Sequence, residues 1–179
     1  NKVCIMATNL QFIKSASGTS VSSLSVTDSF NANYDVYKVI LNDVEVTNSN
    51  AISRLRFLDS GGSVISASEY DFGALNLAAA TSFAERRDTG QTYIDRLGTQ
   101  HTGLIDGGTA IIYIYNPFDS SSYTFAHFQG MARANTGSVT GYGVKGIGVH
   151  KSAEQLSGLN IFPSAGTFDT ISITVYGVK

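Results

Sequence analysis

The chain has 179 residues, of which 42% are hydrophobic and 15% charged, a balance that supports a hydrophobic core and excludes a disordered protein. The formal net charge of -2 argues against a nucleic-acid partner. The longest apolar run, Ala110 to Tyr115, is far shorter than the roughly 20 residues that span a bilayer, so no membrane insertion is expected.

The beginning of the chain has neither a long apolar region nor a cleavage site, which predicts that no signal peptide is present. The single cysteine, Cys4, cannot form an internal disulfide, and no Asn-x-Ser/Thr acceptor for glycosylation occurs. We therefore expect a soluble protein of intracellular origin.

Apolar residues recur with a period of two along the first third of the chain, which indicates strands rather than helices. The pattern covers residues 10–12, 21–26, 36–41, 44–46 and 52–57. The adjacent glycines Gly61 and Gly62 then predict a tight hairpin that pairs residues 54–58 with 64–68.

Residues 74–88 interrupt this alternation. The stretch 74–80 is rich in alanine and leucine, which favours a helix, and the densest charge cluster of the chain follows it. We expect one short helix or a long surface loop over 74–88. A mobile segment that carries both charge signs is suited to pair with a partner, so its charged residues are a candidate contact surface. They are Glu85, Arg86, Arg87 and Asp88.

The second half of the chain predicts four clearer strands, at 109–116, 123–132, 139–150 and 168–178, each bounded by a turn signal. The total of about ten strands is typical of a two-sheet antiparallel sandwich of the jelly-roll kind. No linker or repeat appears. The expected fold is therefore all-β, with one domain over residues 1–179.

The strand at 109–116 has two apolar faces. Tyr113 and Tyr115 share one face, and Ile112 and Ile114 share the other. A strand covered on both faces lies between layers or at a subunit contact. We therefore expect Tyr113, Tyr115 and Phe125 in the core or at a subunit seam.

The run GYGVKG at 141–146 matches the dinucleotide-binding fingerprint literally. That fingerprint needs a helix after its third glycine, because the helix N-terminus holds the pyrophosphate. Residues 147–150 instead continue a strand alternation, so no nucleotide cofactor is expected. The preferred interpretation is a glycine-rich strand that a neighbouring chain or sheet approaches closely. The glycines concerned are Gly141, Gly143, Gly146 and Gly148.

The three histidines do not have metal-ligand spacing. His101, His127 and His150 are far apart in the sequence, and no cysteine or carboxylate clusters with them, so no metal is expected, although a site assembled across strands stays open. On its strand, His127 should share a face with Phe125 and Gln129.

Acidic residues have a simpler explanation than catalysis. Asp59, Asp106 and Asp119 fall at predicted turns, where aspartate accepts hydrogen bonds from its own backbone. No Gly-x-Ser-x-Gly nucleophile motif occurs, and Cys4 between two apolar residues indicates a buried side chain. We expect no catalytic residues. The other acidic candidates are Glu69, Asp71 and Asp95.

Three stretches carry a family resemblance. They are 34–44 (YDVYKVILNDV) with 55–62 (LRFLDSGG), 108–117 (GTAIIYIYNP) leading into 123–125, and 159–168 (LNIFPSAGTF) with the ending 171–179 (ISITVYGVK). They resemble small virion structural proteins of tailed phages, particularly phages of marine bacteria and cyanobacteria. The final strand is similar to the end of jelly-roll-type decoration and fibre-head domains.

This resemblance implies a sandwich fold, self-assembly and no catalytic residues. It leads us to expect a capsid decoration or cement protein of the virion, assembled in the host cytoplasm. Its expected partners are two further copies, which form a homotrimer, and the major capsid protein or other virion proteins. The alternative is a tail-fibre or receptor-binding head that recognises a glycan or protein on the host surface.

Overall fold

The computed structural model describes residues 9–48, 51–78, 83–98, 107–135 and 139–179. Within these ranges the chain forms eleven strands and no helix, which confirms the predicted all-β class with one strand more than expected. A helix of the length and apolarity needed to cross a membrane is likewise absent from these ranges. The strands are β1 (Leu10–Val21), β2 (Leu24–Val26), β3 (Val36–Val46), β4 (Ser53–Asp59), β5 (Tyr70–Ala78), β6 (Ala84–Gln91), β7 (Gly108–Tyr115), β8 (Thr124–Asn135), β9 (Val139–His150), β10 (Leu156–Pro163) and β11 (Phe168–Val178).

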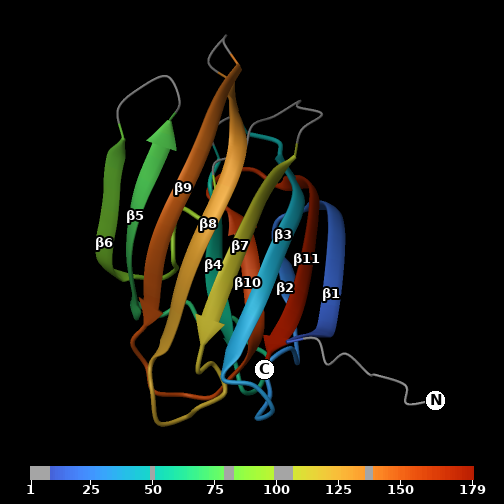
Figure 1. Cartoon of the computed structure of the whole chain (residues 1–179), viewed down its shortest axis with the longest axis vertical. Helices are drawn as coiled ribbons and strands as arrows, with labels where there is room; N and C mark the ends of the chain where they lie inside the picture. Colours follow the sequence, from blue (N-terminus) through green and yellow to red (C-terminus); the bar gives the residue numbers. More distant parts are fainter. Residues whose placement is uncertain (1–8, 49–50, 79–82, 99–106, 136–138) are drawn as a thin grey trace, which may run out of the picture.

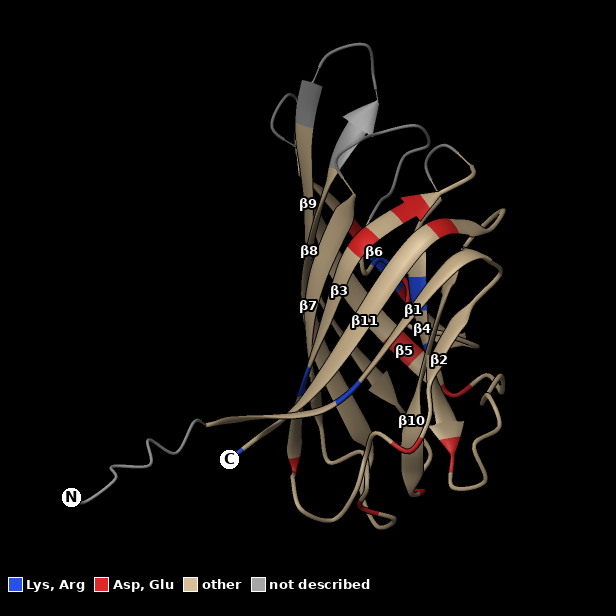
Figure 2. Ribbon diagram, turned by 90° about the vertical axis from the view of Figure 1, so that its right-hand side faces the viewer, with Lys and Arg blue, Asp and Glu red and all other residues tan. Residues whose placement is uncertain are grey.

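The strands form two antiparallel sheets, so the predicted sandwich is confirmed. The large sheet has eight strands in the order β1-β11-β3-β7-β8-β9-β5-β6, and the small sheet has three in the order β2-β10-β4 (Figure 1). Seen from the side, the small sheet covers one face of the large sheet, and the β1 end of the large sheet lies close to β2 (Figure 2). The other face of the large sheet has no layer of described residues over it.

Side-chain alternation divides the large sheet into a buried inner face and an outer face. On β7, Ala110, Ile112 and Ile114 are buried, whereas the residues between them are at least partly exposed. The inner face forms one hydrophobic cluster with the small sheet, and each large side chain buried there contributes about 1.5–3 kcal/mol. The fully buried side chains at the centre are Tyr37, Leu41, Leu55, Phe57, Ile112, Ile114, Phe128 and Phe168.

The predicted hairpin around Gly61 and Gly62 is confirmed only at its turn. The carboxylate of Asp59 accepts hydrogen bonds from the amides of Gly61 and Ser63, both at 2.9 Å. Beyond the turn, the ladder is reduced to a single bridge between Leu58 and Val64. The reason is that β4 pairs with β10 on one side and with the backbone around Ile94 on the other.

The predicted helix or loop over 74–88 is wrong. Residues 70–78 form β5, which pairs with β9 on one side and with β6 on the other. The charged residues 85–88 therefore lie on β6, an edge strand, and not on a loop. Alanine and leucine favour a helix only locally, and two ladders of backbone hydrogen bonds outweigh that preference.

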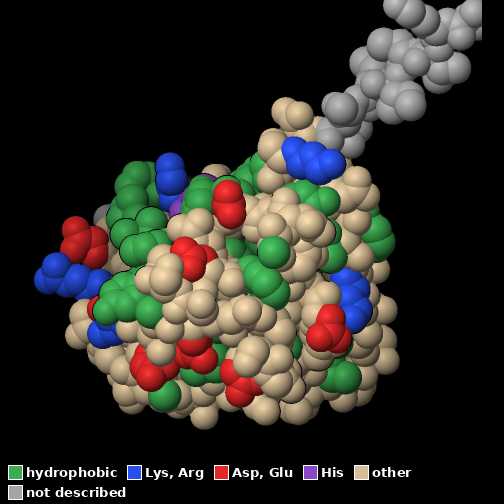
Figure 3. All heavy atoms as spheres, turned by 90° about the horizontal axis from the view of Figure 1, so that it is seen from below, with side chains coloured by type: hydrophobic (Ala, Val, Ile, Leu, Met, Phe, Trp, Pro, Cys, Tyr) green, Lys and Arg blue, Asp and Glu red, His purple; other side chains and the backbone are tan. Residues whose placement is uncertain are grey.

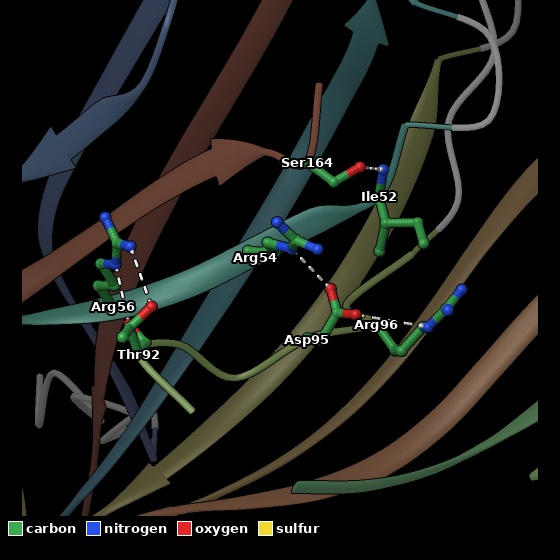
Figure 4. Close-up of polar contacts among 7 residues, drawn as sticks. All are labelled: Ile52, Arg54, Arg56, Thr92, Asp95, Arg96 and Ser164. Atoms are coloured by element: carbon green, nitrogen blue, oxygen red, sulfur yellow. Dashed lines mark hydrogen bonds and ion pairs between the residues drawn. The ribbon is translucent and has the colours of Figure 1, made fainter. Parts of the chain in front are cut away.

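The segment after β6 is fixed to the small sheet by the contacts drawn in Figure 4. The Arg54 side chain donates a hydrogen bond to the Asp95 carboxylate at 3.0 Å, and the Arg56 side chain donates to the carbonyl of Thr92 at 2.9 Å. Between them, the backbone of Ile94 pairs with that of Leu55. These contacts anchor the chain directly after the edge strand and place Ile94 beneath β9.

Candidate functional site

The outer face of the large sheet carries a row of residues that crosses five strands. Cross-strand register aligns Tyr113 on β7 with His127 on β8, His127 with Ile147 on β9, Ile147 with Gly73 on β5, and Gly73 with Arg87 on β6. Opposed residues of neighbouring strands point to the same face. Along the row the side chains are therefore aromatic on β7 and β8, aliphatic on β9, absent at the glycine of β5, and charged on β6.

An ordered stack of rings occupies the first part of this face. The ring centroids of Tyr113 and His127 are 4.9 Å apart with the planes at 20°, and those of Tyr115 and His127 are 5.7 Å apart at 29°. The Tyr115 hydroxyl and His127 Nδ1 are hydrogen-bonded at 2.7 Å. Because stacking and a hydrogen bond act together, this part of the face is held in one arrangement.

Large apolar side chains stand exposed beside the stack. Phe125 is 51% exposed, Met131 59% and Ile147 67%. Phe125 and Ile147 point outward from the neighbouring strands β8 and β9 and line one hollow, so these two side chains form a patch. Met131 lies six residues further along β8. Figure 3 shows hydrophobic side chains gathered towards the side of the molecule where β5 and β6 lie, with acidic and basic side chains at its margin. Contiguous apolar surface of this kind marks interaction sites.

A hollow of about 750 Å³ lies between this patch and the edge strand. One wall is apolar and includes Phe125 and Ile147, and the other includes Arg87 and Thr89. Gly73 lies between the walls, and a Cβ built on it would meet no atom within 4 Å. The hollow exists because β5 carries no side chain at this point of the row.

One end of the hollow is fixed by charge. The Asp71 carboxylate lies 2.8 Å from the Lys151 ammonium and accepts a hydrogen bond from the Gly90 amide at 2.8 Å. These contacts hold the pKa of the Asp71 carboxyl below its usual value. The hollow therefore combines an apolar wall with an ionised, pre-positioned polar end.

Several residues singled out from the sequence meet around this hollow. Arg87, Asp88, Tyr115 and Phe125 all line it, whereas Tyr113 belongs to an adjoining hollow on the same face. The expectation that the tyrosines and Phe125 belong to the core is wrong, because they lie on the outer face. Their place at a subunit seam stays a prediction, as does the contact role of residues 85–88.

The four glycines of β9 differ in their surroundings. A Cβ on Gly146 would lie 2.4 Å from the Phe128 ring, and one on Gly148 would lie 2.6 Å from the Ile94 side chain. Both glycines thus permit close approach within this chain. Gly141 has open space around it, and Gly143 would make only ordinary contacts, so neither is required for close packing. The strand assignment that argued against a nucleotide fingerprint is confirmed.

The sequence interpretation missed Asp71, Gly73 and Ile147 as parts of one site. The alternation of glycine with Ile147 on β9 was a usable signal, since it puts the one large side chain on the opposite face from Gly146 and Gly148. Nothing local marked Gly73, because the hollow depends on which strands lie beside β5.

The histidines have different environments. His127 shares the outer face with Phe125 and Gln129, as predicted. His150 is fully buried, and its Nε2 lies 3.2 Å from Glu69 and 3.7 Å from Glu154. A carboxylate cluster thus does surround one histidine, against the sequence interpretation, and the i,i+4 spacing of His150 and Glu154 was the signal for it. His101 lies outside the described residues.

The acidic turn residues behave as predicted where they are described. Asp59 caps its turn as described above, and the Asp119 carboxylate accepts hydrogen bonds from the amide and hydroxyl of Ser121 at 2.8 and 2.7 Å. Asp95 forms ion pairs with Arg54 and Arg96. Asp106 and Cys4 lie outside the described residues.

Comparison with known proteins identifies no family. No family model matches the chain, and no curated protein does. One solved structure is described as "Prominent members of the human gut microbiota express endo-acting O-glycanases to initiate mucin breakdown". It is 11% identical to this chain with a TM-score of 0.25, and the alignment covers 88% of this chain and 62% of the other chain. A second structure is "SCLam, a non-specific endo-beta-1,3(4)-glucanase from family GH16". It is 7% identical to this chain with a TM-score of 0.25, and the alignment covers 88% of this chain and 63% of the other chain. This chain thus spans about three fifths of each, and likenesses of this size carry no argument.

Proposed function

We propose that this chain is a non-catalytic structural protein of a tailed-phage virion, a decoration or cement protein that binds the assembled shell. In this proposal the outer face of the large sheet, from β7 to β6, is the contact surface. The same face or its edges would join the copies of a homotrimer.

The exposed apolar patch carries this proposal. A monomeric sandwich gains nothing from exposing Phe125 and Ile147 beside one another on a rigid sheet. Burial of such side chains against a partner contributes about 25 cal/mol for each Å² removed from water. The aromatic stack beside the patch is pre-ordered, so little side-chain freedom is lost on binding.

The choice of a phage shell as partner is supported by the resemblance of the three sequence stretches to virion proteins. A decoration protein binds the assembled state preferentially, so each bound copy stabilises the shell by mass action. Outside β6, the strands of the large sheet carry few charged residues, which fits packing against a protein surface better than against nucleic acid (Figure 2).

The test is to mix purified protein with empty expanded capsids, followed by sedimentation and imaging, with host cells as a parallel sample. The double variant Phe125→Thr/Ile147→Thr places β-branched side chains, which suit strands, at both positions but removes the apolar contacts, and should weaken shell binding at least tenfold. Val64→Thr, at another exposed aliphatic residue, is the matched control and should bind as the parent does. Failure of the parent protein to bind shells would refute the decoration role.

A specific observation favours the second candidate, a receptor-binding head. The hollow places aromatic and aliphatic side chains opposite Arg87, Asp88 and Thr89, a combination that suits a sugar with one apolar and one hydroxylated side. Binding to host cells, competition with phage adsorption and no binding to shells would support the head over the decoration protein.

A further inference from the structure

Three potential metal ligands meet at one end of the sandwich. Glu69 directly precedes β5, His150 ends β9, and Glu154 lies in the turn before β10. The β5–β9 register pairs Tyr70 with His150, which brings Glu69 to the end of β9. The turn after His150 brings Glu154 back to the same place.

The ligand atoms already converge. His150 Nε2 lies 3.2 Å from Glu69 Oε2 and 3.7 Å from Glu154 Oε1, and the three ligand atoms all lie within 4.8 Å of one another. A tetrahedral ion with ligands at about 2.0–2.2 Å needs the ligand atoms about 3.3–3.6 Å apart. The glutamate side chains are 38% and 34% exposed, so small rotations can close the remaining gap.

The charge of this cluster is uncompensated. Two carboxylates face one imidazole. Within the described ranges, the ion pairs of Glu69 and Glu154 involve His150 and no lysine or arginine. Lys151, next in the chain, is paired with Asp71. A divalent cation would neutralise the two carboxylates.

We propose that Glu69, His150 and Glu154 form a binding site for a divalent transition-metal ion, with Zn²⁺ as the preferred ion. His150 Nε2 and one oxygen of each carboxylate supply three ligands, and water or a group from a partner supplies the fourth. The mixture of one imidazole and two carboxylates suits Zn²⁺ better than Ca²⁺ or Mg²⁺, which take oxygen ligands.

One feature of His150 limits the affinity. Its Nδ1 is buried without a hydrogen-bond partner in the described part of the chain. When Nε2 binds a metal, the imidazole proton moves to Nδ1, where no acceptor receives it, whereas metal-binding histidines usually donate that proton. A missing outer partner costs about 10–100-fold in affinity, so we expect a micromolar rather than a nanomolar dissociation constant.

The metal would join three chain segments. It would link the start of β5, the end of β9 and the turn before β10, and so fasten the large sheet to the chain that enters the small sheet. Binding only to the folded state raises its stability by RT ln(1 + [L]/Kd), so the melting temperature should rise with Zn²⁺ concentration.

Calorimetric titration of the EDTA-treated full chain with Zn²⁺ tests this site, with Ca²⁺ as a parallel titrant and Co²⁺ absorption as a probe of ligand geometry. We expect one saturable Zn²⁺ site, a tetrahedral Co²⁺ spectrum and at least tenfold weaker Ca²⁺ binding. Glu154→Gln changes a part-exposed side chain and should weaken Zn²⁺ binding at least tenfold while the fold persists. His127→Gln, at the histidine on the outer face, is the matched control and should leave binding unchanged.

The site would be overturned by the absence of saturable Zn²⁺ binding, by binding retained in Glu154→Gln, or by binding lost in His127→Gln. Ca²⁺ binding as strong as Zn²⁺ binding would also overturn it, because His150 would then not be a ligand. The result is independent of shell binding, so the two proposals can fail separately.

Discussion

Ile147 and Gly73 are directly opposed across the β9–β5 ladder, and the space above Gly73 is open. One strand thus supplies the wall of the hollow and the next supplies its floor. A Cβ introduced at Gly73 would enter the hollow without meeting any atom within 4 Å.

Gly73→Leu should therefore fill the hollow and leave the fold intact. We expect loss of binding to the partner that occupies the hollow, with a melting temperature equal to or slightly above that of the parent, because glycine weakens strands. Val64→Leu, at an exposed aliphatic residue outside the large sheet, is the control. Binding of both variants to shells and to cells tests whether the hollow is a contact site. Equal binding by both variants would show that it is not.

Substitution of the inner glycines of β9 should destabilise the fold. A Cβ on Gly148 would lie 2.6–2.8 Å from three atoms of the buried Ile94, so Gly148→Ala must displace that side chain. Overpacking of this kind costs about 1–3 kcal/mol. Urea unfolding compares the variant with Gly141→Ala, which should change stability by less than about 0.5 kcal/mol. Similar stabilities for the two variants would contradict the packing described for Ile94.

Loss of one buried hydroxyl should have a comparable cost. The Tyr70 hydroxyl accepts a hydrogen bond from the Phe57 amide at 3.1 Å and donates one to the Ile65 carbonyl at 3.2 Å. Tyr70→Phe leaves the Phe57 amide unpaired, which costs about 1–3 kcal/mol. Tyr123→Phe, at an exposed tyrosine, is the control and should not change the unfolding midpoint.

Stability should fall as the pH drops below the ordinary histidine pKa of about 6.5. Burial lowers the pKa of His150 in the folded protein, and Glu154 and Glu69 oppose that shift without cancelling it. Between the two pKa values the unfolded chain binds more protons than the folded one, so the free energy of unfolding falls by at most about 1.4 kcal/mol per pH unit. Above pH 6.5 both states are neutral, and His150 makes no pH-dependent contribution.

Urea unfolding in EDTA at several pH values checks this prediction. His150→Gln should flatten the slope in this window, whereas His127→Gln should retain it. The loss expected from Asp71, whose pKa is also lowered, begins only near its usual value of about 3.9, so the two effects are separable. A slope unchanged in His150→Gln would refute the assignment.

The sequence by itself determined the fold class and much of the strand pattern. On β7 the alternation of apolar residues marks both the strand and its two faces, because side chains of a strand point to opposite sides in turn. The turns at Asp59 and Asp119 were predictable for the same local reason, since their hydrogen bonds reach only two to four residues ahead.

Only the tertiary structure decided which strands lie beside one another in the sheet. Residues 74–78 prefer a helix locally and become a strand because β9 and β6 are available on both sides. The hollow over Gly73 and the meeting of Glu69 with His150 depend on the same pairing of β5 with β9. The β5–β9 ladder joins residues 64 to 80 positions apart in the chain, and local propensity carries no information on which partner will be chosen.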